Sequence, residues 1–346
     1  MDDALFQEND RHSEAGAGAS LAELGSFQLV SGASLPVTLA YQTWGTYRGD
    51  NAILACHALS GDSNAAVWWE RLIGPGRAID TDRFFVICAN VLGGCRGSTG
   101  PSSVRDDGRA YGSRFPAVTI RDMTASIAAM LPQIGVNELF AAVGGSMGGM
   151  QVLDLCTHFP VQRAWCTAST GRHSAMQIGF NEVGRQAILR DANFTGGDYY
   201  DGSPPADGLA VARMAGHLTF LSEASFNRKF GRERRPTPTG EIFEVESYLN
   251  YQGDKFTQRF DANSQIVLTR ALDAFDFQPA QSLSTEFLLT SFRSDWIYPT
   301  WQSEELRDQL SMWAKVRHVE LGSPLGHDAF LLDDQEQADL VRLFLQ

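Results

Sequence analysis

Short apolar runs alternate with longer amphipathic stretches at both ends of the chain, and this pattern predicts its secondary structure. Apolar runs that suit strands occupy residues 35–41, 51–57, 83–89, 139–143, 164–168, 286–291 and 316–321. Stretches that suit helices occupy residues 119–131, 147–156 and about 335–345. Strands that alternate with helices predict an α/β fold, with a mostly parallel sheet covered by helices on both faces.

The pattern changes in the middle of the chain. Residues 173–274 are helical in character and contain Gly/Pro-rich loops at 195–208 and 234–240. We therefore predict a core made of residues 20–172 and 275–346, interrupted by a helical lid insertion at 173–274. Residues 1–19 are polar and acidic without an apolar segment, so we expect a disordered leader and not a signal peptide.

Composition and charge narrow the class of protein. The chain has 346 residues, 43% of them hydrophobic, which suffices for a large core, and no apolar stretch is long enough to span a membrane. A formal charge of −13 argues against nucleic acid and anionic membranes as partners. The five cysteines lack C-x-x-C spacing, which disfavours a disulfide framework or a zinc site and fits a reducing cytoplasm.

The run G-G-S-M-G at residues 144–148 is the most informative motif. It reads as G-x-S-x-G between the predicted strand at 139–143 and the predicted helix at 147–156. A strand, a tight glycine-flanked turn and a helix form the nucleophile elbow of α/β hydrolases. The motif therefore predicts that Ser146 is a nucleophile, and we expect the helical insertion to cover the sheet edge where it emerges.

A serine hydroxyl needs a base and an orienting acid, which follow it along the chain in this fold. Asp295 and His327 each follow a late predicted strand, so we assign them as acid and base. Asp328 is the rival acid, but it adjoins His327 and is badly placed to reach the far ring nitrogen. We interpret the remaining histidines as structural or as lying in the leader: His12, His57, His158, His173, His217 and His318.

Acyl chemistry also needs donors for a developing oxyanion. One donor is expected to be the backbone N–H of Met147, directly after Ser146, and the second the N–H of Leu59 in the loop at 57–62. The Gly-rich segment at 90–101 lacks the Lys-Ser/Thr ending of a phosphate-binding loop. We expect it to line the mouth of the active site.

Distinctive segments between about residues 40 and 332 make the chain resemble the homoserine O-acetyltransferase family of α/β-hydrolase-fold acyltransferases. They occupy residues 40–46, 57–62, 79–83, 90–101, 144–150, 180–183, 251–256, 294–296 and 326–330. The resemblance implies ping-pong transfer of an acetyl group from acetyl-CoA, through acyl-Ser146, to the hydroxyl of L-homoserine. The product would feed methionine synthesis, and no metal or cofactor beyond the CoA co-substrate is implied.

The resemblance also implies how the amino-acid substrate is held. Asp328, beside the catalytic base, would bind the substrate ammonium, and an arginine would bind its carboxylate. Arg185 is the first candidate for that arginine and Arg213 the second. The family further implies a homodimer formed through the helical insertion.

Some positions depart from the pattern of acetyl-transferring relatives. Ser60 stands where many have Thr, Leu221 where some have Arg, and Gln265 where Tyr is common. Succinyl-CoA as donor and serine as acceptor therefore remain open. An esterase, with water as acceptor, and a non-catalytic binding protein are alternatives on the same fold.

Overall fold

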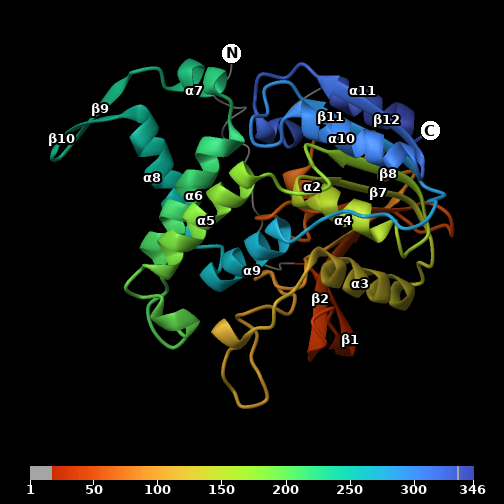
Figure 1. Cartoon of the computed structure of the whole chain (residues 1–346), viewed down its shortest axis with the longest axis horizontal. Helices are drawn as coiled ribbons and strands as arrows, with labels where there is room; N and C mark the ends of the chain where they lie inside the picture. Colours follow the sequence, from red (N-terminus) through yellow and green to blue (C-terminus); the bar gives the residue numbers. More distant parts are fainter. Residues whose placement is uncertain (1–17, 333–334) are drawn as a thin grey trace.

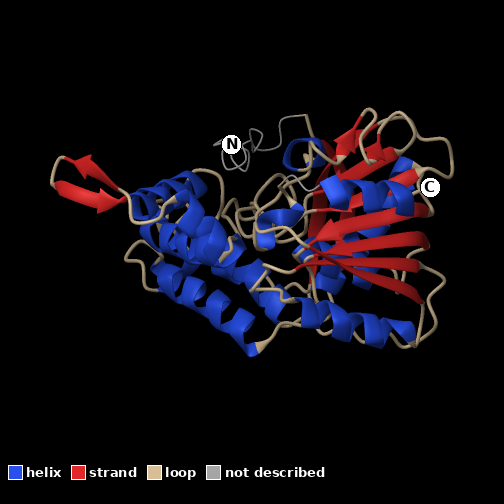
Figure 2. Cartoon of the chain, turned by 90° about the horizontal axis from the view of Figure 1, so that it is seen from above, coloured by secondary structure: helices blue, strands red, loops and turns tan. Residues whose placement is uncertain are grey.

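The computed structural model describes residues 18–332 and 335–346, which form an eight-stranded sheet with a helical insertion at one end (Figures 1 and 2). The strands follow the order β1 (Ser20–Gln28), β2 (Ser34–Trp44), β6 (Phe85–Ala89), β3 (Ala52–Cys56), β7 (Leu139–Gly145), β8 (Val161–Thr167), β11 (Glu286–Phe292) and β12 (Lys315–Leu321). β2 pairs antiparallel with β1 and β6, and all other pairs are parallel. The predicted mostly parallel sheet is confirmed, whereas β1 was not predicted.

The buried side chains form two apolar layers, one on each face of the sheet. Successive residues of β3 alternate between them, with Ile53 in one layer and Leu54 in the other, as the period of a strand requires. Helices α3 (Ile120–Met130), α4 (Met147–Leu155) and α10 (Thr300–Ser311) contribute to one layer, and α2 (Ala65–Trp68) and α11 (Gln335–Phe344) to the other. Helices therefore cover both faces, as expected.

Local sequence explains where the helices begin. α3 starts after Thr119, whose side chain accepts a hydrogen bond from the Asp122 N–H while the Asp122 carboxylate accepts one from the Thr119 N–H. Ser174 and Gln177 form the same reciprocal cap before α5 (Ala175–Leu189). Such caps satisfy backbone donors that the first helical turn leaves unpaired.

Five helices occupy the range predicted for the insertion: α5, α6 (Ala206–Phe220), α7 (Glu223–Lys229), α8 (Glu244–Thr257) and α9 (Ala262–Asp273). The expected loop at 234–240 is instead largely a hairpin of β9 (Arg234–Thr237) and β10 (Gly240–Phe243), which projects from this end of the molecule (Figure 2). Shorter elements complete the described chain: β4 (Ile73–Gly74), β5 (Ile79–Asp80), η2 (Gly112–Arg114), η3 (Leu131–Ile134), η4 (Thr195–Gly197) and η5 (His327–Phe330).

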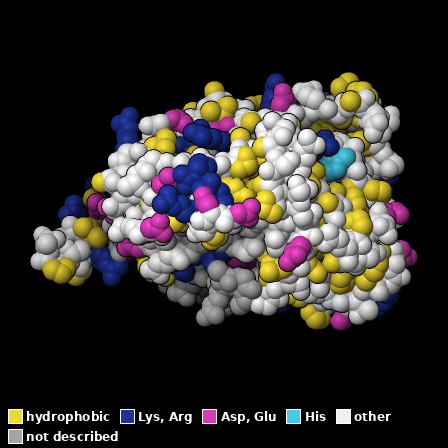
Figure 3. Space-filling view, turned by 90° about the horizontal axis from the view of Figure 1, so that it is seen from below, with side chains coloured by type: hydrophobic (Ala, Val, Ile, Leu, Met, Phe, Trp, Pro, Cys, Tyr) yellow, Lys and Arg dark blue, Asp and Glu magenta, His cyan; other side chains and the backbone are white. Residues whose placement is uncertain are grey.

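The expected disordered leader falls mostly on residues 1–17, which lie outside the described residues. In the part of the chain that is described, every helix is too short or too polar to cross a membrane. On the face drawn in Figure 3, basic and acidic side chains lie interspersed.

Candidate active site

Ser146 sits in a strained turn between β7 and α4. Its backbone has φ 56° and ψ −123°, a conformation that a non-glycine residue adopts only when its surroundings enforce it. The neighbouring backbones are in close contact, because a Cβ atom on Gly148 would lie 2.1 Å from the carbonyl oxygen of Cys56. Ser146 is further tied through its N–H to the Thr167 carbonyl at 3.0 Å and through its carbonyl to the Ser169 hydroxyl at 2.8 Å. This is the geometry of a nucleophile elbow.

Asp295 and His327 meet on loops that follow β11 and β12. These strands are parallel neighbours, so both loops leave the sheet at the same edge. His327 Nδ1 lies 2.7 Å from Asp295 Oδ2, and both side chains are almost fully buried. Asp295 Oδ1 also accepts hydrogen bonds from the backbone N–H groups of Ile297 at 3.1 Å and Tyr298 at 2.8 Å. The carboxylate is thus fixed where it orients the imidazole ring.

One cavity brings most of the predicted site residues together. Ser146, His327, Leu59 and Asp328 line it, and Met147 begins α4 directly beside Ser146. Residues of α5, α6, α8 and α9 form about half of its wall, so helices of the range 173–274 lie over Ser146. Asp295 lies one hydrogen bond behind the cavity, through His327.

The two candidate arginines occupy different places. Arg185 is buried in an ion-pair network, with Nε 2.9 Å from Glu182 Oε2 and a terminal nitrogen 2.6 Å from Asp273 Oδ2. It is absent from the described cavity wall, so the expectation that Arg185 holds the substrate carboxylate is not supported. Arg213 does line the cavity, where its guanidinium lies over the rings of Phe220 and Phe256. The two carboxylates that bind Arg185 come from α5 and α9.

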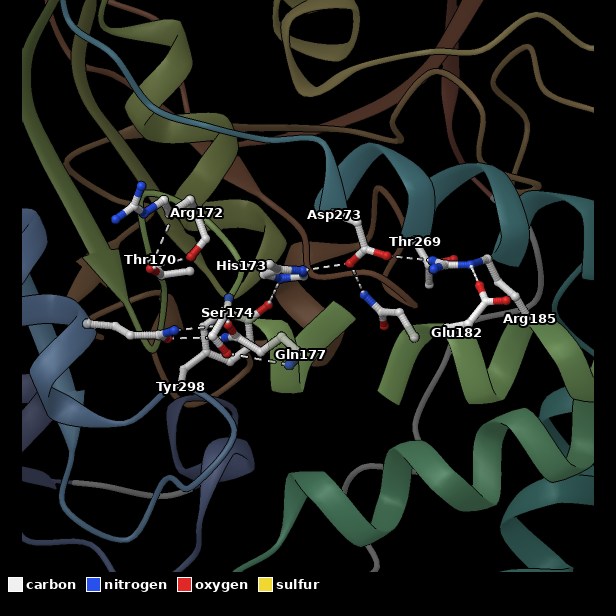
Figure 4. Close-up of polar contacts among 12 residues, drawn as sticks. Thr170, Arg172, His173, Ser174, Gln177, Glu182, Arg185, Thr269, Asp273 and Tyr298 are labelled. Carbon is white, nitrogen blue, oxygen red and sulfur yellow. Dashed lines mark hydrogen bonds and ion pairs between the residues drawn. The ribbon is translucent and has the colours of Figure 1, made fainter. Parts of the chain in front are cut away.

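Two functional candidates were missed by the sequence analysis, namely Tyr298 and His173. Both line the cavity, and the Tyr298 hydroxyl lies 2.7 Å from His173 Nε2 (Figure 4). Tyr298 also forms a side-chain hydrogen bond with Ser146. The Tyr298 ring also stacks on His327, with ring centres 4.7 Å apart. Burial raises the pKa of Tyr298, and the hydrogen bond with Ser146 opposes that rise. The sequence offered one weak signal, the position of Tyr298 three residues after Asp295.

His57 has the structural role predicted for it. Its Nδ1 lies 2.7 Å from the Ala58 carbonyl oxygen, and its Nε2 accepts a hydrogen bond from the Val91 N–H at 3.1 Å. Burial lowers the pKa of this ring, which favours the neutral form that both contacts need. The Gly-rich segment at 90–101 packs against His57 and β2. We expected it at the cavity mouth, but none of its residues is among the described residues that line the cavity.

We searched the described residues for a metal site and for a reactive cysteine. Across residues 18–332 and 335–346, no three His, Cys, Asp or Glu side chains gather as a metal site. All five cysteines are free, and burial raises the pKa of Cys95, the least buried of them, to about 11. A thiol with such a pKa is a poor nucleophile at neutral pH.

Known proteins resemble this chain over most of its length. A family described as the alpha/beta hydrolase fold matches residues 51–334. The homoserine O-acetyltransferase of Methanosphaerula palustris is 49% identical over 333 residues, which cover 88% of this chain and 68% of the relative.

Solved structures agree with this in fold. A crystal structure of homoserine O-acetyltransferase from Bacillus anthracis matches with a TM-score of 0.88 at 25% identity, covering 95% of this chain and 97% of its own. The crystal structure of esterase E22 also matches with a TM-score of 0.88, at 27% identity, covering 95% of this chain and 99% of its own. The same fold thus accommodates proteins named for acyl transfer and for ester hydrolysis.

Proposed function

The chain belongs to the homoserine O-acetyltransferase family of the α/β-hydrolase fold, and we propose that it transfers an acetyl group from acetyl-CoA to the hydroxyl of L-homoserine. The observation that carries the proposal is Ser146, held on its elbow in one cavity with His327, which Asp295 orients. Similarity over most of the chain to relatives named for this activity supports the choice of substrates.

In the first half-reaction Ser146 becomes acylated. As Oγ attacks the thioester carbon, His327 takes the hydroxyl proton, and the imidazolium that forms is stabilised by Asp295. The carbon–sulfur bond then breaks, and His327 returns the proton to the departing thiolate. The N–H groups of Met147 and Leu59 are the proposed donors to the oxyanion of the tetrahedral intermediate.

In the second half-reaction the acyl-enzyme meets the acceptor. His327 removes the proton from the γ-hydroxyl of homoserine as this oxygen attacks the acyl carbon, and then returns a proton to the Ser146 oxygen. Acetyl-homoserine leaves and feeds methionine synthesis. The proposed chemistry uses side chains, backbone N–H groups and the CoA co-substrate, and it calls for no metal or bound cofactor.

Charge at the cavity wall supports a revised model of amino-acid binding. Arg213 replaces Arg185 as the proposed partner of the substrate carboxylate, because Arg213 lines the cavity that contains Ser146. Asp328 lies on the same wall and is the proposed partner of the substrate ammonium. One cation and one anion in a single cavity suit a zwitterionic amino acid.

Two other reactions deserve a direct test. A hydrolase is the second candidate, favoured by the similarity to esterase E22, because water can replace homoserine at the same acyl-enzyme. Succinyl-CoA as donor or serine as acceptor would keep the mechanism. Ser60, within 3.4 Å of Arg213, and Gln265, on the cavity wall, are positions where this chain departs from acetyl-transferring relatives.

Assembly and location form part of the same proposal. Exposed apolar side chains on the insertion helices, among them Met176, Val183 and Val211, support a homodimer formed through the insertion. The five free thiols support a reducing compartment, which we propose to be the cytoplasm.

The decisive experiment measures thiol release from acetyl-CoA and from succinyl-CoA, each with L-homoserine, with L-serine or with no amino acid. We expect release from acetyl-CoA that depends on homoserine and falls by at least about 1,000-fold in Ser146→Ala. Equal release without an amino acid would mean that water is the acceptor. Turnover restricted to succinyl-CoA would change the donor and keep the mechanism.

A further inference from the structure

A second polar network, separate from Asp295 and His327, ends at Ser146. It runs from the Tyr298 phenol through His173 to Asp273, at the end of α9 (Figure 4). His173 Nδ1 lies 2.9 Å from Asp273 Oδ1, and His173 Nε2 lies 2.7 Å from the Tyr298 oxygen. The Tyr298 hydroxyl also forms a hydrogen bond with Ser146, so Ser146 has a polar partner other than Asp295 and His327.

The charge of Asp273 sets the direction of the first hydrogen bond. Burial alone would raise its pKa, but hydrogen bonds from His173, Asn181 and Arg185 outweigh burial and lower it, so Asp273 is a carboxylate at neutral pH. A carboxylate only accepts, and His173 Nδ1 must therefore carry a proton and donate it. Arg185 is the cationic partner of Asp273, with a terminal nitrogen 2.6 Å from Asp273 Oδ2.

The remaining directions follow along the network. In the tautomer that carries its single ring proton on Nδ1, Nε2 is an acceptor, and the Tyr298 O–H donates to it. The Tyr298 oxygen then faces Ser146 with its lone pairs and accepts from the Ser146 hydroxyl. Each donor thus has one defined acceptor, from Ser146 through Tyr298 and His173 to Asp273.

Tyr298 also fixes the second reacting group. Its ring stacks on the imidazole of His327, with an angle of 18° between the planes, and its backbone N–H binds Asp295 Oδ1 at 2.8 Å. One residue thus contacts the nucleophile, the base and the acid that orients the base. Such contacts preserve the spacing of reacting atoms, to which rates are very sensitive.

We propose that Tyr298 is a catalytic residue that holds the Ser146 oxygen in register with His327, and that His173 and Asp273 are positioning residues acting through Tyr298. The inference rests on the proposed role of Ser146 as nucleophile. Before acylation the Ser146 O–H points to Tyr298, and rotation about the Cβ–Oγ bond turns it to His327 while the oxygen stays in place. The proton then moves from Ser146 to His327, and Tyr298 keeps its own proton throughout.

The first test is Tyr298→Phe, which keeps the ring and removes the hydroxyl. We expect kcat to fall on the order of 10- to 100-fold, with KM for acetyl-CoA and for homoserine unchanged, because the lost contact aligns Ser146 and binds neither substrate. Tyr199→Phe is the matched control, since Tyr199 is also buried and its hydroxyl binds Asp261 at 2.7 Å, away from the cavity wall. An unchanged kcat in Tyr298→Phe would overturn the proposal.

A substrate-free readout separates this inference from the proposed function. The rate constant for labelling of Ser146 by a fluorophosphonate is expected to fall with kcat in Tyr298→Phe and to stay unchanged in Tyr199→Phe. This first-order constant does not depend on how much of a variant is folded. If the wild-type protein labels but transfers no acetyl group, the proposed function fails while this test still decides the role of Tyr298.

The final test asks whether His173 acts through Tyr298. His173→Leu should slow labelling as much as Tyr298→Phe does, whereas His173→Gln, whose amide can accept from Tyr298, should recover most of the rate. In the double variant His173→Leu with Tyr298→Phe, labelling should be no slower than in Tyr298→Phe alone. Additive losses would show that His173 acts independently of Tyr298 and would overturn the proposed network.

Discussion

At the scale of single residues, burial decides which arginine can meet a substrate. We predict that Arg213→Met raises KM for homoserine by about 10- to 100-fold, because a charge-assisted hydrogen bond to the carboxylate is worth about 1.5–3 kcal/mol. Arg185→Met should leave that KM unchanged and lower the free energy of unfolding by about 3 kcal/mol, because it leaves partly buried Asp273 without its cation. Steady-state kinetics and urea unfolding of both variants measure the two effects.

The two variants serve as controls for each other. Each removes one guanidinium from the insertion, so a general loss of packing would affect both KM values alike. A rise of KM in Arg185→Met at normal stability, with none in Arg213→Met, would return the carboxylate site to Arg185.

Chain order carries the sequence signal for three of the predicted site residues. Ser146 has a motif, and Asp295 and His327 follow strands in the order that the fold imposes, so sequence alone could place them at one sheet edge. Tyr298 and His173 are 125 positions apart and have no motif, and only the folded loop geometry brings their side chains together. The ion pair of Arg185 could not be predicted either, because its partner Asp273 lies 88 positions away.

At the scale of elements, glycine allows α5 and α6 to pack closely. A Cβ atom on Gly208 in α6 would lie 2.5 Å from the Ala187 carbonyl oxygen of α5, whereas one on Gly179 in α5 would meet nothing within 4 Å. We predict that Gly208→Ala destabilises the protein by about 1–3 kcal/mol by overpacking. Gly179→Ala should stabilise it by about 0.5–1 kcal/mol, because alanine favours a helix. Thermal unfolding distinguishes the two, and equal effects would contradict the close approach.

Asp273 links α9 to α5 and to the segment before α5 through hydrogen bonds to its carboxylate. The stability that these contacts contribute should depend on pH. Its pKa is lowered in the folded protein, so its contribution to stability is present above its unfolded pKa and is lost as pH falls through the lower, folded value. Urea unfolding should therefore show a large loss for Asp273→Asn at pH 7 and a smaller one below about pH 4. Asp276→Asn, at an exposed carboxylate, is the control. A loss in Asp273→Asn that is independent of pH would contradict the role of the Asp273 charge in linking α9 to α5.

Elements could be predicted where burial makes the sequence periodic. β3, β7 and β11 are almost wholly buried, so each stands out as an apolar run. β1 and the hairpin of β9 and β10 are mostly exposed and polar, which removes the hydrophobic signal of a strand. For such segments, pairing with a neighbouring strand defines the structure, and composition does not.

At the scale of the whole molecule, the insertion completes the cavity that the core begins. The core supplies Ser146 and His327, and the insertion supplies Arg213 and most of the wall, so neither part holds the site alone. A wall of helices over an acyl-enzyme limits the access of water, which is what transfer requires and hydrolysis does not. The balance between the two reactions therefore depends on how firmly the insertion helices are held.

A homodimer formed through the insertion would hold these helices in place, and we predict such a dimer. We expect light scattering after gel filtration to give twice the 37.9 kDa mass of one chain. Val183→Arg with Val211→Arg should convert it to the monomer, because charges on α5 and α6 would have to be buried in the contact. Val104→Arg, at an equally exposed valine of the core, should leave the dimer intact. A wild-type monomer would contradict the assembly, and a monomeric variant with increased thiol release in the absence of homoserine would show that the contact between copies keeps water out.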